Sequence, residues 1–161
     1  MVMNAEESSF QSIVDYNLQP VIYSFDLLKK FEDYLREQGI KSFPVHLEIE
    51  TGMNRLGFSL SEIESLAKHI ASSSLQIQSV FSHLAASEDP SQDEFTNEQA
   101  LLFKQAIHII QQHINYPFLK HISNSAAIVR HPQLQMDMVR LGIGLYGIEI
   151  DNDGILELTP V

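Results

Sequence analysis

The chain has 161 residues, of which 44% are apolar and 19% charged, a composition typical of one folded domain rather than a disordered or fibrous chain. Twenty-one acidic residues against ten Lys and Arg give a formal net charge of -11, which argues against nucleic acid as a partner. The absence of cysteine excludes disulfides and thiolate metal sites. The chain has no secretory signal pattern and no apolar run near the roughly 20 residues of a membrane helix, so we expect a cytoplasmic protein without a membrane partner.

Short apolar segments alternate with longer segments of helical period, a pattern typical of parallel strands joined by crossover helices. The first unit is a strand at 21–23 and a helix that Ser24 caps. The second is a strand at 45–50 and a helix near 60–70, for which Ser59 and Ser61, each with a Glu three residues later, are candidate capping boxes. The fold class is therefore predicted to be α/β.

A further helix is predicted to open at Thr96, with Gln99 completing its capping box. Four more segments have the apolar pattern of strands, namely 1–4, 77–83, 119–124 and 136–140. The segment 1–4 is equally consistent with a plain terminus. Five or six such strands fit either an open doubly wound sheet or an incomplete (β/α)8 barrel, which normally takes about 250 residues. Length alone favours the open sheet.

One face of the strand at 45–50 is charged, because side chains alternate along a strand and His46, Glu48 and Glu50 share a face. Parallel strands are usually covered on both sides, so charges there require partners or a function. Arg55, which follows the next turn, is a candidate partner of Glu48. The alternative is an exposed edge strand whose carboxylates are solvated.

Three histidines lie on three different predicted strands. His83 ends one of them and is placed to stack on a planar ligand or to transfer protons, although a loop histidine often has neither role. His46, His83 and His121 together could form a metal site, but none has the short spacing that makes such a site specific.

Two segments are candidates for binding an anion. Ser125 follows a predicted strand beside small residues, where a hydroxyl and backbone amides can approach a phosphate; the alternative is a plain helix cap. Arg140 ends an apolar segment and is followed by Gly142 and Gly144, which free amides to face an anion. The alternatives there are a simple bend and a structural ion pair.

Four segments, taken in order, resemble the alanine racemase family: VHLEIETGMNRLGF at 45–58, FSHLA at 81–85, NSAA at 124–127 and RLGIGLYG at 140–147. The resemblance implies a partial (β/α)8 TIM barrel that replaces the open sheet, covering about strands 3 to 8 and lacking the first strands and the C-terminal β domain. It places the barrel domain at 1–150 and the start of the connection to the β domain at 151–161. It also implies pyridoxal 5'-phosphate as cofactor.

The resemblance implies roles only where residues match the family pattern. Arg140 corresponds to the arginine that donates to the pyridine nitrogen of the cofactor, and His83 to the histidine beside that ring. Arg55 corresponds to the arginine near the phenolic oxygen of the cofactor and the substrate carboxylate, which a planar guanidinium binds well. The implied catalytic residues are Arg55, His83 and Arg140. The implied cofactor-binding residues are His83, Asn124, Ser125, Arg140, Gly142 and Ile143.

Two residues depart from the family pattern. Glu48 stands where many members have a carbamylated lysine, and Leu141 replaces a frequent proline. The resemblance further implies that the lysine that holds the cofactor precedes Met1 and that a tyrosine base comes from the C-terminal domain of a partner subunit.

We therefore expect a segment of a homodimeric racemase that interconverts L- and D-alanine for peptidoglycan synthesis, inactive as an isolated piece. The alternatives are a non-catalytic barrel that binds pyridoxal phosphate or phosphate, and a metal-dependent hydrolase.

Overall fold

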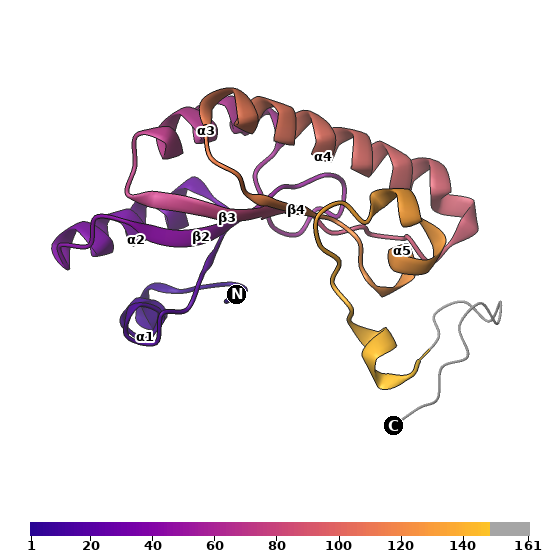
Figure 1. Ribbon diagram of the computed structural model, residues 1–161, viewed down its shortest axis with the longest axis horizontal. Coiled ribbons are helices and arrows are strands. Elements are labelled where there is room, and N and C mark those ends of the chain that lie inside the picture. The colour runs from indigo at the N-terminus through magenta and orange to yellow at the C-terminus, as the bar shows by residue number, and fades with distance from the viewer. Residues whose placement is uncertain (149–161) are drawn as a thin grey trace.

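The computed structural model describes residues 1–148, and these residues form a parallel sheet with helices packed against it (Figure 1). The sheet has four strands in the order β1-β2-β3-β4, all parallel to their neighbours. The strands are β1 (Val21–Ile22), β2 (Phe43–Glu48), β3 (Leu75–Phe81) and β4 (Leu119–His121). The predicted α/β class is confirmed.

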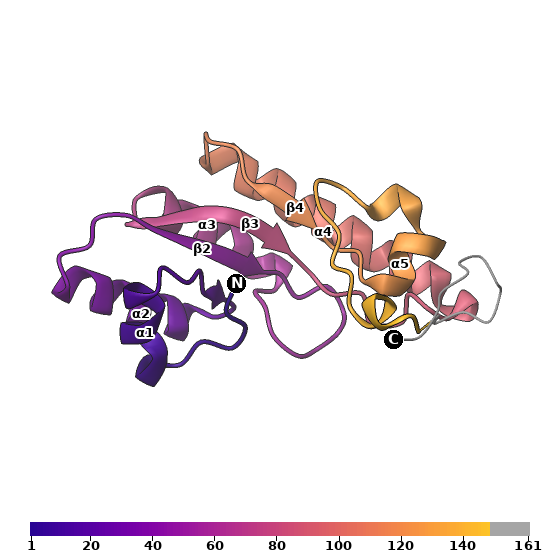
Figure 2. The same cartoon turned by 60° about the horizontal axis from the view of Figure 1, so that its bottom comes forward.

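Five α-helices connect and flank the strands. They are α1 (Phe10–Asp15), α2 (Phe25–Glu37), α3 (Ile63–Ala71), α4 (Asp93–His113) and α5 (Ser125–Arg130). In Figure 1, α3 and α4 lie along one side of the sheet. Figure 2 shows α1 and α2 side by side at one end of the molecule and α5 at the other, toward which the arrowhead of β3 points. The carboxyl ends of the strands therefore face the α5 end.

Aromatic side chains fasten α1 and α2 to the sheet. The ring of Phe31 on α2 meets Phe10 on α1 at 5.0 Å and Phe43 on β2 at 5.4 Å, both edge to face. Such pairs add about 0.5–1.5 kcal/mol each to the burial of the rings. The core extends from these rings to the alternating residues Val45 and Leu47 of β2 and to Leu75 and Ile77 of β3.

Local signals fix where the early helices begin. The Ser24 hydroxyl accepts a hydrogen bond from the N–H of Leu27 at 3.3 Å and caps α2. Ser59 and Glu62 form the predicted capping box before α3, with the N–H of Ser59 donating to the Glu62 carboxylate at 2.8 Å. Each bond satisfies an N–H that the first turn of a helix leaves unpaired.

The predicted start of the fourth helix is wrong. Helix α4 begins at Asp93, after a short 3₁₀ helix capped by Asp89, so Thr96 and Gln99 are buried inside the helix rather than at its end. Both side chains are buried, as is that of Phe103. Gln99 forms hydrogen bonds to Thr51 and His83, whereas Thr96 Oγ1 has no hydrogen-bond partner within the described chain.

Two predicted strands differ from the observed chain path. The segment 136–140 is not a strand: Met136 adopts a left-handed backbone, and only the N–H groups of Asp137 and Arg140 bond to the β4 segment, donating to Lys120 and Ser123. At the other edge, Val2 forms a single parallel bridge with Pro20 just before β1. Both segments flank the sheet without completing a ladder.

Candidate active site

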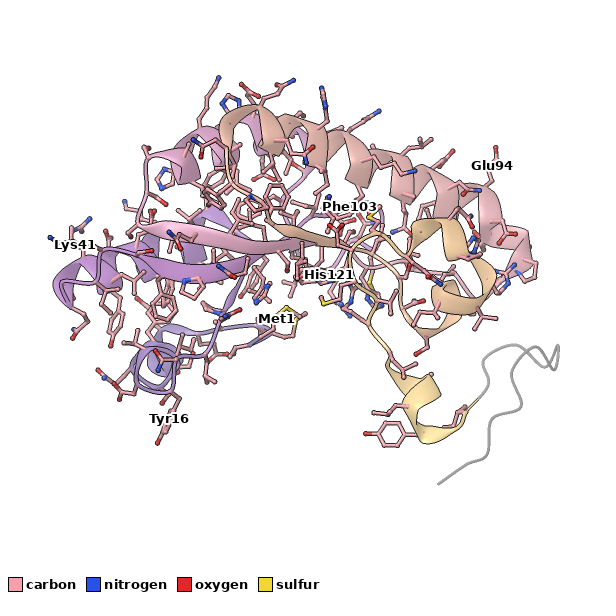
Figure 3. All side chains as sticks on the ribbon, in the orientation of Figure 1. Met1, Tyr16, Lys41, Glu94, Phe103 and His121 are labelled. Atoms are coloured by element: carbon pink, nitrogen blue, oxygen red, sulfur yellow. The ribbon has the colours of Figure 1, made fainter. Side chains whose placement is uncertain are left out.

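Loops that follow the carboxyl ends of β2, β3 and β4 hold most of the predicted site residues. Glu48 ends β2, His83 lies two residues past β3, and Asn124 follows β4. Figure 3 shows His121 on the side of the sheet away from α4, whereas Phe103 lies between α4 and the sheet. The polar site and the apolar core therefore occupy opposite faces.

Arg140 is the centre of the site. Its Nη2 donates to the carbonyl of Ser82 at 2.6 Å and that of Ile122 at 3.2 Å, and it meets Nδ1 of His83 at 3.5 Å. Its Nη1 donates to Nδ1 of His121 and, at 3.3 Å, to the carbonyl of the same residue. The Nε–H group makes no hydrogen bond within residues 1–148, so one donor remains for a ligand.

Arg140 lies half-buried against an aromatic ring, and its burial lowers the pKa of its guanidinium. Its guanidinium carbon lies 5.2 Å from the centroid of the Phe81 ring, and that ring stacks on His121 at 5.0 Å. Burial lowers the pKa of Arg140 to about 10, and the negative charge of Glu48 opposes that shift. The side chain therefore stays cationic at neutral pH.

His83 lies between the two predicted site arginines. Burial lowers its pKa, and the positive charges of Arg140 and Arg55 lower it further. Arg55 itself is exposed at the end of the loop after β2, and its backbone N–H donates to the Glu50 carboxylate at 3.3 Å. The same carboxylate accepts from the N–H of Gly52, so Glu50 closes the loop that presents Arg55.

Glu48 is buried without a direct partner. It is 3% exposed, and its Oε2 accepts no hydrogen bond within the described chain. Burial raises its pKa, while the charges of Arg55 and Arg140 oppose the rise. The alternative of a solvated edge strand is wrong because β2 lies between β1 and β3. The predicted pairing with Arg55 is an interaction at a distance and not a contact.

The late glycine segment folds over Ser125. The Ser125 hydroxyl accepts hydrogen bonds from the N–H of Gly142 at 2.8 Å and of Gly144 at 3.3 Å, and Ile143 begins a 3₁₀ helix over Ile143–Tyr146. Two amides thus converge on one oxygen, whose own proton is left to donate. The alternative of a helix cap holds for Asn124, which accepts from the N–H of Ala127 at 3.0 Å.

The three histidines do not gather around a common point. His46 Nδ1 and His121 Nε2 both bond to the Ser79 hydroxyl, at 2.6 and 2.9 Å, while His83 approaches Arg140. No group of three or more His, Cys, Asp or Glu in the described range is arranged to hold a metal ion. The hypothesis of a three-histidine metal centre therefore finds no support in the geometry.

Sequence reasoning missed Gln99, which joins two site loops. From inside α4, its Nε2 donates to the carbonyl of His83 at 3.1 Å and to Thr51 Oγ1 at 3.3 Å, and its Oε1 accepts from the N–H of Ala85 at 3.0 Å. The available signal was its spacing: Gln99 falls four residues before Phe103, on the apolar face of the helix.

Comparison with known proteins identifies this arrangement. The class is that of domains described as alanine racemase, N-terminal domain, whose family model matches residues 1–150. An alanine racemase of Sorangium cellulosum is 34% identical over 152 residues, which cover 94% of this chain and 40% of that protein. The chain belongs to the alanine racemase family, and it spans about two-fifths of the length of this relative.

Solved structures agree with that assignment. An alanine racemase from Clostridium difficile 630 superposes with a TM-score of 0.87 at 28% identity, covering 98% of this chain and 43% of that one. One from Bartonella henselae, solved with covalently bound pyridoxal phosphate, gives 0.81 at 24% identity over 97% of this chain and 44% of that one, a likeness in fold. No helix in residues 1–148 is long and apolar enough to cross a membrane.

Proposed function

We propose that the chain forms about strands 3 to 8 of a (β/α)8 barrel, with residues 1–150 in the barrel and 151–161 leading toward a further domain. Val2 lies beside β1, and the segment 136–140 lies beside β4, so six chain segments follow one another in barrel order. Residues 149–161, most of which this proposal assigns to the connection, lie outside the described residues.

We further propose that this site holds pyridoxal 5'-phosphate. The fit rests on two features: the unpaired Nε–H of Arg140, a donor for a ring nitrogen, and the convergence of the Gly142 and Gly144 amides on Ser125. The phosphate would bind at Ser125, Gly142 and Ile143. The Ser125 hydroxyl already accepts from the Gly142 N–H and keeps its own proton to donate, and the N–H of Ile143 makes no hydrogen bond within residues 1–148. Asn124 is already used as a cap, so we assign it a role in shaping the ring pocket.

When bound, the cofactor supplies an electron sink for the α-carbon of an amino acid. Arg140 would hold the ring nitrogen with a permanent donor, which would disfavour a proton there. Arg55, on its exposed loop, presents a guanidinium to the substrate carboxylate. His83, whose pKa is lowered by burial and then by the charges of the two arginines, would hold Arg140 in place from one side. The reaction we propose for the whole protein is the interconversion of L- and D-alanine by a homodimer that serves peptidoglycan synthesis.

In this proposal the chain supplies residues that surround the cofactor but not the lysine that binds it covalently. Its six lysines are Lys29, Lys30, Lys41, Lys68, Lys104 and Lys120. None of them contacts the groups around Arg140, and three pair with carboxylates elsewhere on the surface. The lysine that binds the cofactor, and the opposed tyrosine base, are therefore assigned to other parts of the whole protein.

The observation that carries the proposal is the free Nε–H of Arg140, together with the Gly142 and Gly144 amides that converge on Ser125. The test is D-alanine formation from L-alanine by the whole protein with pyridoxal phosphate, compared with Arg140→Gln and with Arg36→Gln as control. Arg36 pairs only with Asp33 on the exposed face of α2. We expect loss of activity in the first variant alone; no turnover by the unmutated protein, or equal turnover by Arg140→Gln, would refute the function.

The 161-residue chain itself should form no D-alanine above background. An absorbance titration of the whole protein with pyridoxal phosphate tests the non-catalytic alternative. Binding of the cofactor without racemisation of alanine would support that alternative.

A further inference from the structure

A row of hydrogen-bonded side chains crosses the polar face of the sheet and ends at Arg140. Gln19 Oε1 lies 2.9 Å from Nε2 of His46, whose Nδ1 lies 2.6 Å from the Ser79 hydroxyl. The same hydroxyl lies 2.9 Å from Nε2 of His121, whose Nδ1 faces Arg140. The row joins the segment before β1 to β2, β3 and β4.

The direction of every hydrogen bond in the row follows from Arg140. A guanidinium only donates, so Nδ1 of His121 must accept and the proton of a neutral His121 must be on Nε2. That proton is donated to the Ser79 oxygen. Since Ser79 is 0% exposed, its own proton needs a buried acceptor, and the facing Nδ1 of His46 provides one. His46 then carries its proton on Nε2 and donates to Gln19.

Both imidazoles in the row are held neutral. Burial lowers the pKa of His121 to about 3, with a further contribution from the charge of Arg140. Burial lowers the pKa of His46 to about 4. A proton added to Nδ1 of His121 would point at a guanidinium, so the row has a single arrangement in which every donor meets an acceptor.

We infer that Ser79 and His46 are positioning residues: through the row they hold His121 in its Nε2–H tautomer, and this tautomer fixes the guanidinium of Arg140. Without Ser79, the Nε2–H of His121 has no acceptor. Moving the proton to Nδ1, toward Arg140, then no longer costs the hydrogen bond to Ser79. The effect on catalysis rests on the proposed function, whereas the direction of the row is a property of this chain alone.

The first test is nitrogen NMR of the imidazoles in the ¹⁵N-labelled chain, without cofactor. We expect His46 and His121 both to be single Nε2–H tautomers at neutral pH. Because this measurement needs no variant, a folding defect cannot obscure it. A proton on Nδ1 of either residue in the unmutated chain would overturn the inference, whatever the outcome of the racemase assay.

The second test uses Ser79→Ala with Ser123→Ala as the matched control. Ser123 is also 0% exposed, but its hydroxyl donates to the carbonyl of Leu134, outside the row. We expect Ser79→Ala to convert His46 and His121 from single tautomers to mixtures, Ser123→Ala to leave both unchanged, and Ser79→Thr to restore the single tautomers. Unchanged tautomers in Ser79→Ala would overturn the role of Ser79.

The whole protein provides a third measurement. If Ser79 acts by fixing Arg140, which does not contact the substrate carboxylate, Ser79→Ala should lower kcat for alanine racemisation with little change in KM. A rise in KM with unchanged kcat would contradict positioning through Arg140. Absence of racemisation in the unmutated protein would refute the proposed function and leave the NMR result standing.

Discussion

The loop that contains Arg55 has no room for a Cβ atom at Gly57. Its φ is +119°, and a Cβ there would lie 2.6 Å from the backbone N of Glu50, 2.8 Å from the carbonyl carbon of Ile49 and 3.1 Å from the carbonyl oxygen of Glu48. All three atoms are backbone at the end of β2, so none can rotate away. The left-handed conformation costs an alanine about 1–2 kcal/mol, and overpacking adds about 1–3 kcal/mol.

Gly57→Ala should therefore lower the free energy of unfolding by about 2–5 kcal/mol. Gly39→Ala is the matched control, because Gly39 also has a positive φ, of +69°, but no atom within 4 Å of its added Cβ. It should cost only the conformational part, about 1–2 kcal/mol. Urea unfolding followed by circular dichroism measures both variants. Equal losses in the two variants would refute the close approach of Gly57 to β2.

Three further predictions concern the site and the sheet. Since the pKa of His121 is about 3 in the folded chain against 6.5 in the unfolded one, the unfolded state takes up the proton first. Stability should fall as pH drops below about 6.5, by about 2 kcal/mol at pH 5 from this residue, and less steeply in His121→Gln; parallel pH curves would contradict this. Gln99→Leu should cost about 2–3 kcal/mol in urea unfolding, because the N–H of Ala85 loses its buried partner; a change below about 0.5 kcal/mol would contradict it. The short outer strands leave backbone groups unpaired at the sheet edges, so the 161-residue chain should self-associate in light scattering; a stable monomer would be the contrary result.

The sequence predicted which residues lie near one another best where they follow a strand end. Because parallel strands end at one edge of a sheet, residues beyond different strands had to lie near one another. His83, two residues past β3, does meet Arg140, whose backbone N–H bonds to Ser123 just beyond β4. Ser125 and the glycine segment were predicted to face an anion together, and they contact each other directly. The roles assigned to these residues stay predictions until the cofactor and activity measurements are made.

The errors arose where tertiary contacts override a local pattern. Thr96 and Gln99 match a capping box in sequence. In the structure both are buried inside the helix, which starts earlier, at Asp93. The segment 136–140 has apolar strand composition, yet the left-handed turn at Met136 breaks its register with β4. Ser79 has no motif at all: its importance follows only from two histidines that are distant in the sequence.

The arrangement around Arg140 keeps a local positive charge in a chain with a net charge of -11. Its guanidinium bonds to carbonyl groups and to the imidazoles of His83 and His121, which orient the cation without neutralising it. Glu48 lowers the cost of burying that cation, but from a distance and with one oxygen unpaired. Had Glu48 bonded to Arg140 directly, the positive potential at the Nε–H would be largely cancelled, and the neutral partners of the arginine preserve it.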